Sequence, residues 1–168
     1  MTKAPDIEEN IVVKGAANLT GTAGEHYVAY KLSCLGLIAA LPRGGAMGID
    51  VLVSNEDGSR TLAVQVKTTD WAMRTRGRGK DKVPFELQFP LGYKSAKIDN
   101  PSLVFAFVDL RGIRTETMPD VYLVPATFVS AHCQPWIEDA KMVRFHIGID
   151  KLTEFKNAWN LVTEMFEA

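Results

Sequence analysis

The sequence predicts one α/β domain built around a mixed β-sheet. An early segment with helical spacing of apolar residues is followed by several short apolar strands, and a second helical segment closes the chain. The 168 residues suffice for one domain with a real core but are too few for two. Hydrophobic residues make up 46% of the chain and charged residues 23%, which is ordinary for a globular protein.

The first helix follows an N-terminal segment, residues 1–16, that we expect to be loosely ordered, so that the domain spans 17–168. Thr20 or Thr22 can cap this helix and Gly36 can end it. The residues expected to form its buried stripe recur at intervals of three and four: Ala23, Tyr27, Tyr30 and Cys34, widened by Ala29 and Leu32.

The strands come next. Residues 48–54 and 61–69 flank the turn sequence NEDGS and predict an antiparallel hairpin. Residues 70–82 break all periodicity and are expected to form a flexible basic loop. Further strands are predicted at 83–89, 102–110, 121–125 and 142–149, with a helical turn at 126–133 and a closing helix at 152–166.

Polar residues interrupt the predicted hairpin where apolar ones would be more stabilising. Asp50 lies on the first strand, and Gln65 and Lys67 lie two residues apart on the second, so the latter two share one face. Val66, between them, points to the opposite face. Glu25, in the first helix, supplies a further carboxylate.

Residue type indicates the chemistry. Asp50 and Glu25 offer carboxylate oxygens, Gln65 a neutral amide oxygen, and Val66 its main-chain carbonyl. Oxygen donors of this kind suit Mg²⁺ or Mn²⁺. Lys67 could orient an attacking water or stabilise charge on a phosphate. The alternative is that these residues have structural roles. Asp50 would cap or pair at a strand end, and Lys67 would extend its charged end into water from an edge strand. Glu25 would be stabilised in the first turn of the helix by the helix dipole.

The stretch GIDVLVSNEDGSRTLAVQVKTT resembles the core motif of the PD-(D/E)xK nuclease superfamily, which has the restriction-endonuclease-like fold. Asp50 matches the first acid, Lys67 the lysine and Glu25 the helix acid of that motif. The resemblance implies a Mg²⁺-dependent endodeoxyribonuclease with Glu25, Asp50 and Gln65 at the metal. Ile49 stands where the motif has Pro, and Gln65 replaces its second acid. That replacement leaves open a catalytically inactive module that binds nucleic acid or a partner protein.

Nucleic acid is the expected partner, held by a local patch because the formal net charge is only −1. A flexible basic loop beside a metal site could clamp phosphates, although charge runs are often merely solvated. Trp71 could stack on a base. The candidate phosphate-binding residues are Arg43, Arg74, Arg76, Arg78, Lys80 and Lys82.

Other classes of function are disfavoured. The two cysteines show no zinc spacing, the glycines near the first helix lack a P-loop ending, and the histidines show no HExxH spacing. We also expect no organic cofactor. The polar, acidic start argues against a secretory signal, and no stretch is apolar enough for a membrane span, so a cytoplasmic location is expected. Cleavage of both strands of a duplex would call for a homodimer, but no surface is marked as its interface.

Overall fold

Two β-sheets organise the protein in a computed structural model that describes residues 17–43, 48–112, 117–140 and 143–167. The first has five strands in the order β1-β2-β3-β6-β7, and the second has three in the order β4-β5-β8. In the first sheet β3 and β6 are parallel and the other neighbours antiparallel, so the sheet is mixed. The strands are β1 Ile38–Ala40, β2 Val51–Ser54, β3 Thr61–Thr69, β4 Met73–Arg76, β5 Val83–Pro90, β6 Leu103–Asp109, β7 Asp120–Pro125 and β8 Arg144–Gly148.

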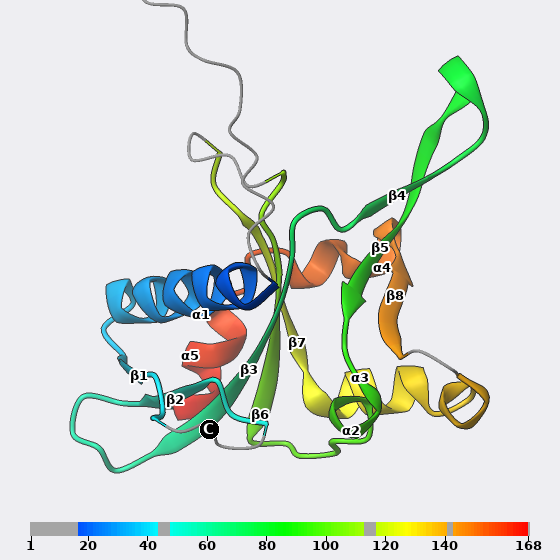
Figure 1. The fold of residues 1–168 in the computed structure, drawn as a ribbon. Coiled ribbons are helices and arrows are strands. Elements are labelled where there is room, and N and C mark those ends of the chain that lie inside the picture. The colour runs from blue at the N-terminus through cyan, green and yellow to red at the C-terminus, as the bar shows by residue number, and fades with distance from the viewer. Residues whose placement is uncertain (1–16, 44–47, 113–116, 141–142, 168) are drawn as a thin grey trace, which may run out of the picture.

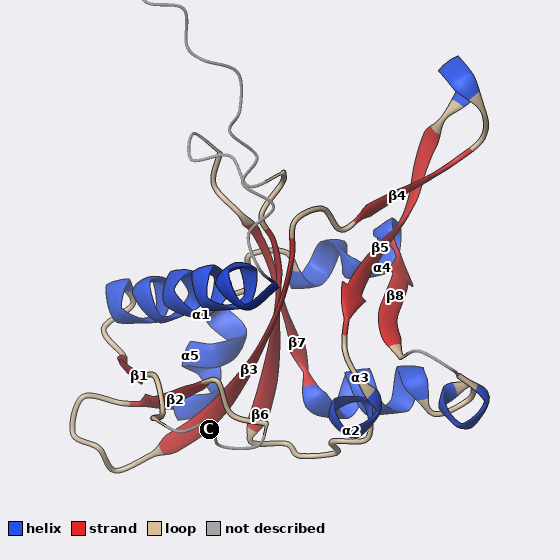
Figure 2. Ribbon diagram, viewed as in Figure 1, coloured by secondary structure: helices blue, strands red, loops and turns tan. Residues whose placement is uncertain are grey.

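Helices cover the five-stranded sheet on one face, and the smaller sheet packs toward the other (Figures 1 and 2). Helices α1 and α5 lie on the first face, whereas β5, β8 and α3 pack against the second. The α-helices are α1 Ala17–Cys34, α2 Tyr93–Ala96, α3 Ala126–Cys133, α4 Ile149–Leu152 and α5 Asn160–Glu167, and the 3₁₀ turns are η1 Gly79–Asp81, η2 Ile137–Asp139 and η3 Thr153–Phe155.

Each face of the five-stranded sheet has its own apolar core. Beneath α1, Val64 and Val66 of β3 pack with Val28 and Leu32 of the helix. On the opposite face, aromatic rings fill the space between the sheets; Phe107 stacks on Phe145 with ring centroids 4.5 Å apart. Because side chains alternate along a strand, β3 sends its even-numbered residues toward α1 and its odd-numbered residues toward the smaller sheet.

The predicted fold class is confirmed: a mixed sheet is flanked by helices in an α/β arrangement. The hairpin of β2 and β3 is antiparallel as expected, and β6 is fully buried between β3 and β7. The predicted N-terminal segment 1–16 lies outside the described residues. No helix in the described part of the chain has the length and apolarity to cross a bilayer.

The buried face of α1 differs from the predicted one. The helix begins at Ala17, before both predicted caps, and buries Gly24, Val28 and Leu32. Tyr30 is 59% exposed, and Ala23 and Cys34 are also exposed. Apolar residues occur around the whole helix, so spacing alone does not select a face. The close approach of the backbone to β3 at Gly24 selects it instead.

The predicted loop 70–82 is in large part an arm. Strand β4 pairs with β5, with an irregular register between Arg74 and Thr75, and the ribbon projects from the body before turning through η1 (Figure 1). Thr75, Arg76 and Val83 are exposed. A ribbon with little buried surface needs no alternation of apolar and polar residues, which is why periodicity failed to predict it.

The predicted closing helix, 152–166, is broken in two. Asn157 adopts a left-handed backbone (φ 52°), and its N–H donates to the carbonyl of Val121 at 2.7 Å. Lys156 forms a bridge with Tyr122, so this segment lies along the free edge of β7. Covering an edge strand satisfies its backbone groups, a tertiary effect that helical spacing does not reveal.

Candidate active site

Asp50 lies at the open end of the hairpin, directly before the first residue of β2. The last pair of the ladder is Val51 with Val64, and the N–H of Asp50 still donates to the carbonyl of Val64 (3.0 Å). One residue further along β3, the N–H of Val66 donates to Oδ2 of Asp50 (2.7 Å). The carboxylate of Asp50 therefore accepts the hydrogen bond that a backbone carbonyl of a paired strand would otherwise accept, and this bond fixes it against β3.

The main-chain carbonyl of Val66 points to the same edge. The N–H of Ala63 and the carbonyl of Thr69 bond toward β6, so odd-numbered residues of β3 direct their backbone groups that way. The backbone N–H and carbonyl groups of even-numbered residues point toward β2. Val66 lies beyond the last residue that pairs with β2, so its carbonyl faces the part of this edge that β2 does not cover. Its side chain is buried in the core beneath α1, which leaves the carbonyl as its contribution to the site.

Gln65 and Lys67 project from the face of β3 that is turned away from α1. Asp50 shares this face, because Val51 and Val53 of β2 point the other way into the core beneath α1. Gln65 is only 5% exposed, and its Oε1 is buried without a hydrogen-bond partner among the described residues. A buried amide oxygen without a partner costs about 1–3 kcal/mol, so a ligand bound to Oε1 would be stabilising.

Glu25 comes from α1, which packs on the other face of β3. The helix crosses β3 at Gly24, where a Cβ would collide with the side chain of Thr68. Burial raises the pKa of the Glu25 carboxyl, and the negative charge of Asp50 raises it further, while His26 and Lys67 act in the opposite direction. Glu25 therefore lies within electrostatic range of both Asp50 and Lys67.

The donor set fits a hard divalent cation. Two carboxylates, an amide oxygen without a partner and a backbone carbonyl are the ligand types that Mg²⁺ and Mn²⁺ take, with water completing the sphere. Among the described residues no three side chains of His, Cys, Asp or Glu gather at one point. Here the third side-chain donor is an amide, Gln65, in place of an acid.

Most of the predicted phosphate-binding residues lie on the arm, which projects from the body (Figure 1). Arg43 is exposed before the undescribed residues 44–47. Arg76 lies over the ring of Phe85 on the arm, 4.6 Å from its centroid. The remaining basic residues of the arm, Arg78, Lys80 and Lys82, are exposed toward its end. Arg74, at the base of the arm, is the one that lies against the body.

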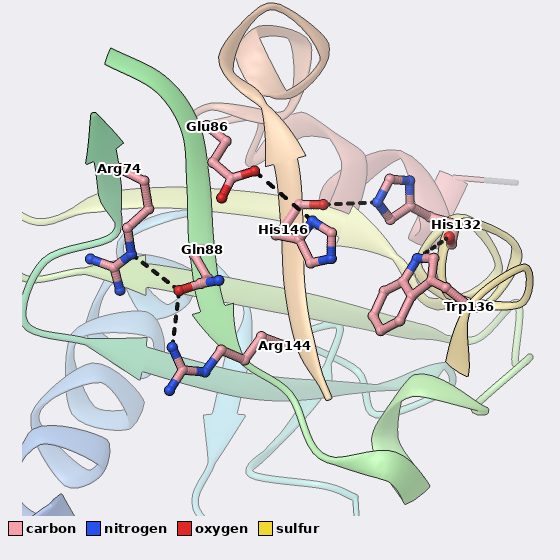
Figure 3. A network of polar contacts seen from close by, with 7 residues as sticks. All are labelled: Arg74, Glu86, Gln88, His132, Trp136, Arg144 and His146. Atoms are coloured by element: carbon pink, nitrogen blue, oxygen red, sulfur yellow. Dashed lines mark hydrogen bonds and ion pairs between the residues drawn. The ribbon is translucent and has the colours of Figure 1, made fainter. Parts of the chain in front are cut away.

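Sequence reasoning missed Gln88, which accepts from Arg74, and Arg144, which donates to the same Gln88 oxygen (Figure 3). Their signal was the alternation in VPFELQF and MVRFHIGI, which places polar residues between buried ones, but nothing in it joins the two strands. Two histidines make structural contacts: a ring nitrogen of His132 hydrogen-bonds the carbonyl of His146 (2.9 Å), and the carbonyl of His132 accepts from Trp136 (3.1 Å). Asp109 is a turn acid that accepts from the N–H of Arg111.

Comparison with known proteins finds a likeness of fold. The chain is similar to the solved structure of a bacterial homing endonuclease, I-Ssp6803I, with a TM-score of 0.50 and 14% sequence identity. The match covers 90% of this chain and 96% of that one. No known protein family matches the sequence, and no curated protein matches it. The fold of this chain is therefore one that an endonuclease uses.

Proposed function

We propose that this protein is a metal-dependent endonuclease that hydrolyses phosphodiester bonds in DNA. The observation that carries the proposal is the buried amide oxygen of Gln65, which has no partner among the described residues, on the same face of the hairpin as the carboxylate of Asp50. Glu25, with a pKa raised by burial and by Asp50, adds a second carboxylate. The fold shared with a homing endonuclease supports the same activity.

Four groups would hold the metal: the side chains of Glu25, Asp50 and Gln65, and the carbonyl of Val66. A bound Mg²⁺ would lower the pKa of a coordinated water and neutralise charge on the phosphodiester. The Val66 N–H holds the Asp50 carboxylate in place before any cation arrives, so the site needs little reorganisation. Lys67, half-buried on the same face, would orient the attacking water or stabilise the charge that develops on the phosphate.

The arm would hold the DNA. Its exposed basic residues, Arg76, Arg78, Lys80 and Lys82, project from the body on a two-stranded ribbon (Figure 1). Neutralising phosphates releases counterions, so the affinity should fall steeply with salt. Two-stranded ribbons also fit the major groove of duplex DNA. Arg43, which is exposed after β1, would add a further phosphate contact.

Cleavage assays with matched variants test the proposal. The wild type with Mg²⁺ or Mn²⁺ should cleave DNA, and EDTA should stop it. Asp50→Ala and Lys67→Ala should abolish cleavage while the circular dichroism spectrum stays native. Asp57→Ala and Lys94→Ala remove the same side chains from exposed positions and should leave the rate unchanged. A wild type that leaves single-stranded, duplex and branched DNA intact with both metals would refute the enzyme claim.

A second function follows from the missing acid at Gln65. A module that binds DNA but has lost turnover would keep the fold, the arm and Asp50. The variant Gln65→Glu separates the two, because it restores one negative charge to the site. An active wild type excludes the inactive module. An inactive wild type that binds DNA and gains cleavage through Gln65→Glu establishes it.

A further inference from the structure

The outer face of the three-stranded sheet carries a polar cluster that the proposed catalytic groups do not include. Phe89 of β5 and Phe145 of β8 point inward to the core, so their neighbours Gln88 and Arg144 point outward. Arg74 of β4 lies on the same outer side, because Met73 packs against the core. Strand β5 is the middle strand, which places Gln88 between the two arginines.

Both arginines bond the same oxygen atom (Figure 3). Arg74 donates through Nε to Oε1 of Gln88 at 3.1 Å, and Arg144 donates through Nη1 to that oxygen at 3.0 Å. A second bond, from Arg74 Nη1 to the carbonyl of Trp71 (3.3 Å), fixes the Arg74 guanidinium from behind. Two positive groups thus converge on one neutral acceptor, which positions both of them.

A hollow opens at this cluster, with a volume of about 190 Å³. Since one water occupies about 30 Å³ in the liquid, the hollow has room for a phosphate group with several waters. Its wall also includes Thr69, the last residue of β3. Thr69 follows Lys67 by two residues, a distance of about 7 Å along the strand. The hollow therefore lies at the end of the strand that carries Gln65 and Lys67. It is lined by Thr69, Arg74, Gln88, Phe89, Pro90 and Arg144.

We infer that Arg74 and Arg144 form a seat for a backbone phosphate of the nucleic acid, next to the one that is cleaved. Guanidinium groups bind phosphate oxygens through charge-assisted hydrogen bonds with a fixed fork geometry. Gln88 bridges the two guanidinium groups, and all three side chains line the hollow. The assignment of the phosphate to DNA rests on the proposed function, whereas the presence of an anion seat rests on the geometry of the cluster alone.

The variant Gln88→Glu distinguishes this seat from a merely structural network. A carboxylate between the two guanidinium groups would strengthen the contacts within the cluster and should keep or raise the melting temperature. It would also neutralise the positive charge that the phosphate needs. A structural role alone therefore predicts unchanged binding, whereas the phosphate seat predicts weaker binding by an equally stable protein.

The DNA experiment uses the full chain with Asp50→Asn, so that binding is measured without cleavage. In this background Gln88→Glu and Arg144→Gln should each weaken the binding of labelled duplex DNA about tenfold. The slope of log K against log salt should become shallower by about 0.9, the loss of one phosphate contact. Arg60→Gln removes an exposed arginine in the turn between β2 and β3 and should change neither quantity. Unchanged affinity and slope in both cluster variants would overturn the inference.

Inorganic phosphate tests the seat without DNA, so failure of the proposed function does not hide the result. At constant ionic strength, phosphate should raise the melting temperature of the wild type and of Arg60→Gln. It should raise that of Arg144→Gln and Gln88→Glu much less. A protein that binds no DNA but shows this pattern refutes the proposed function and keeps the anion seat. Equal shifts in all four proteins, without an effect on DNA binding, overturn the seat.

Discussion

Gly24→Ala should destabilise the protein although alanine favours helices. The Cβ added at Gly24 would collide with Oγ1 of Thr68 and lie 3.0 Å from its Cβ and Cγ2, so α1 or β3 must shift. Gly21, one turn earlier in the same helix, is the matched control, because a Cβ there meets nothing within 4 Å. Both substitutions gain about 1 kcal/mol of helix propensity. Only Gly24→Ala also incurs overpacking, about 1–3 kcal/mol.

The difference between the two variants is therefore about 1–3 kcal/mol, since the propensity term cancels. In a protein of this length each kcal/mol shifts the melting temperature by about 2–4 °C, so the variants should melt roughly 2–12 °C apart. Differential scanning calorimetry in EDTA measures this difference in melting temperature. Gly21→Ala should melt slightly above the wild type and Gly24→Ala at or below it.

Thr68→Ala supplies an internal check. Oγ1 of Thr68 is buried without a partner among the described residues, so its removal forfeits no hydrogen bond seen there. In the Thr68→Ala background the destabilisation by Gly24→Ala should shrink, which a double-mutant cycle would measure as coupling. Equal melting temperatures for Gly24→Ala and Gly21→Ala, or no coupling with Thr68, would refute the close contact that positions Glu25.

Two further predictions concern charge and packing. Because burial and Asp50 raise the pKa of Glu25, this carboxyl favours the folded state fully below its ordinary pKa, and the stabilisation is lost as pH rises through the raised value. Glu25→Gln should therefore become more stable than the wild type as pH rises from about 4 to 8 in EDTA, by thermal unfolding; a variant less stable at neutral pH would contradict this. Phe107→Ala removes a fully buried ring that contacts Phe89, Phe105 and Phe145 and should cost about 3–5 kcal/mol in urea unfolding. Val83→Ala, at a position 57% exposed on the arm, should change stability by less than about 0.5 kcal/mol, and similar losses in both would contradict the assigned core.

The sequence predicted the hairpin well because its signals are local. The NEDGS turn sets the register, and alternation along residues 61–69 places Gln65 and Lys67 on one face. The predicted strand 48–54 includes Asp50, whereas β2 begins one residue later, at Val51, and the carboxylate of Asp50 accepts the Val66 N–H instead. Turn chemistry and strand period were sufficient for the pairing of the two strands and for the shared face of Gln65 and Lys67.

Tertiary effects account for what the sequence did not predict. The buried face of α1 depends on a backbone contact between Gly24 and β3, which no spacing within the helix encodes. The closing helix breaks because Lys156 and Asn157 pair with β7. Gln88 and Arg144 lie 56 residues apart in the chain, and only the pairing of β5 with β8 brings them together.

The most direct test of the metal site is a crystal structure of the protein soaked in Mn²⁺, with anomalous diffraction recorded to locate the ion. The account predicts one strong peak bounded by the carboxylates of Glu25 and Asp50, Oε1 of Gln65 and the carbonyl of Val66, and no such peak in Asp50→Ala. A wild-type crystal without a peak there, or with Glu25 and Gln65 directed away from Asp50, would contradict it.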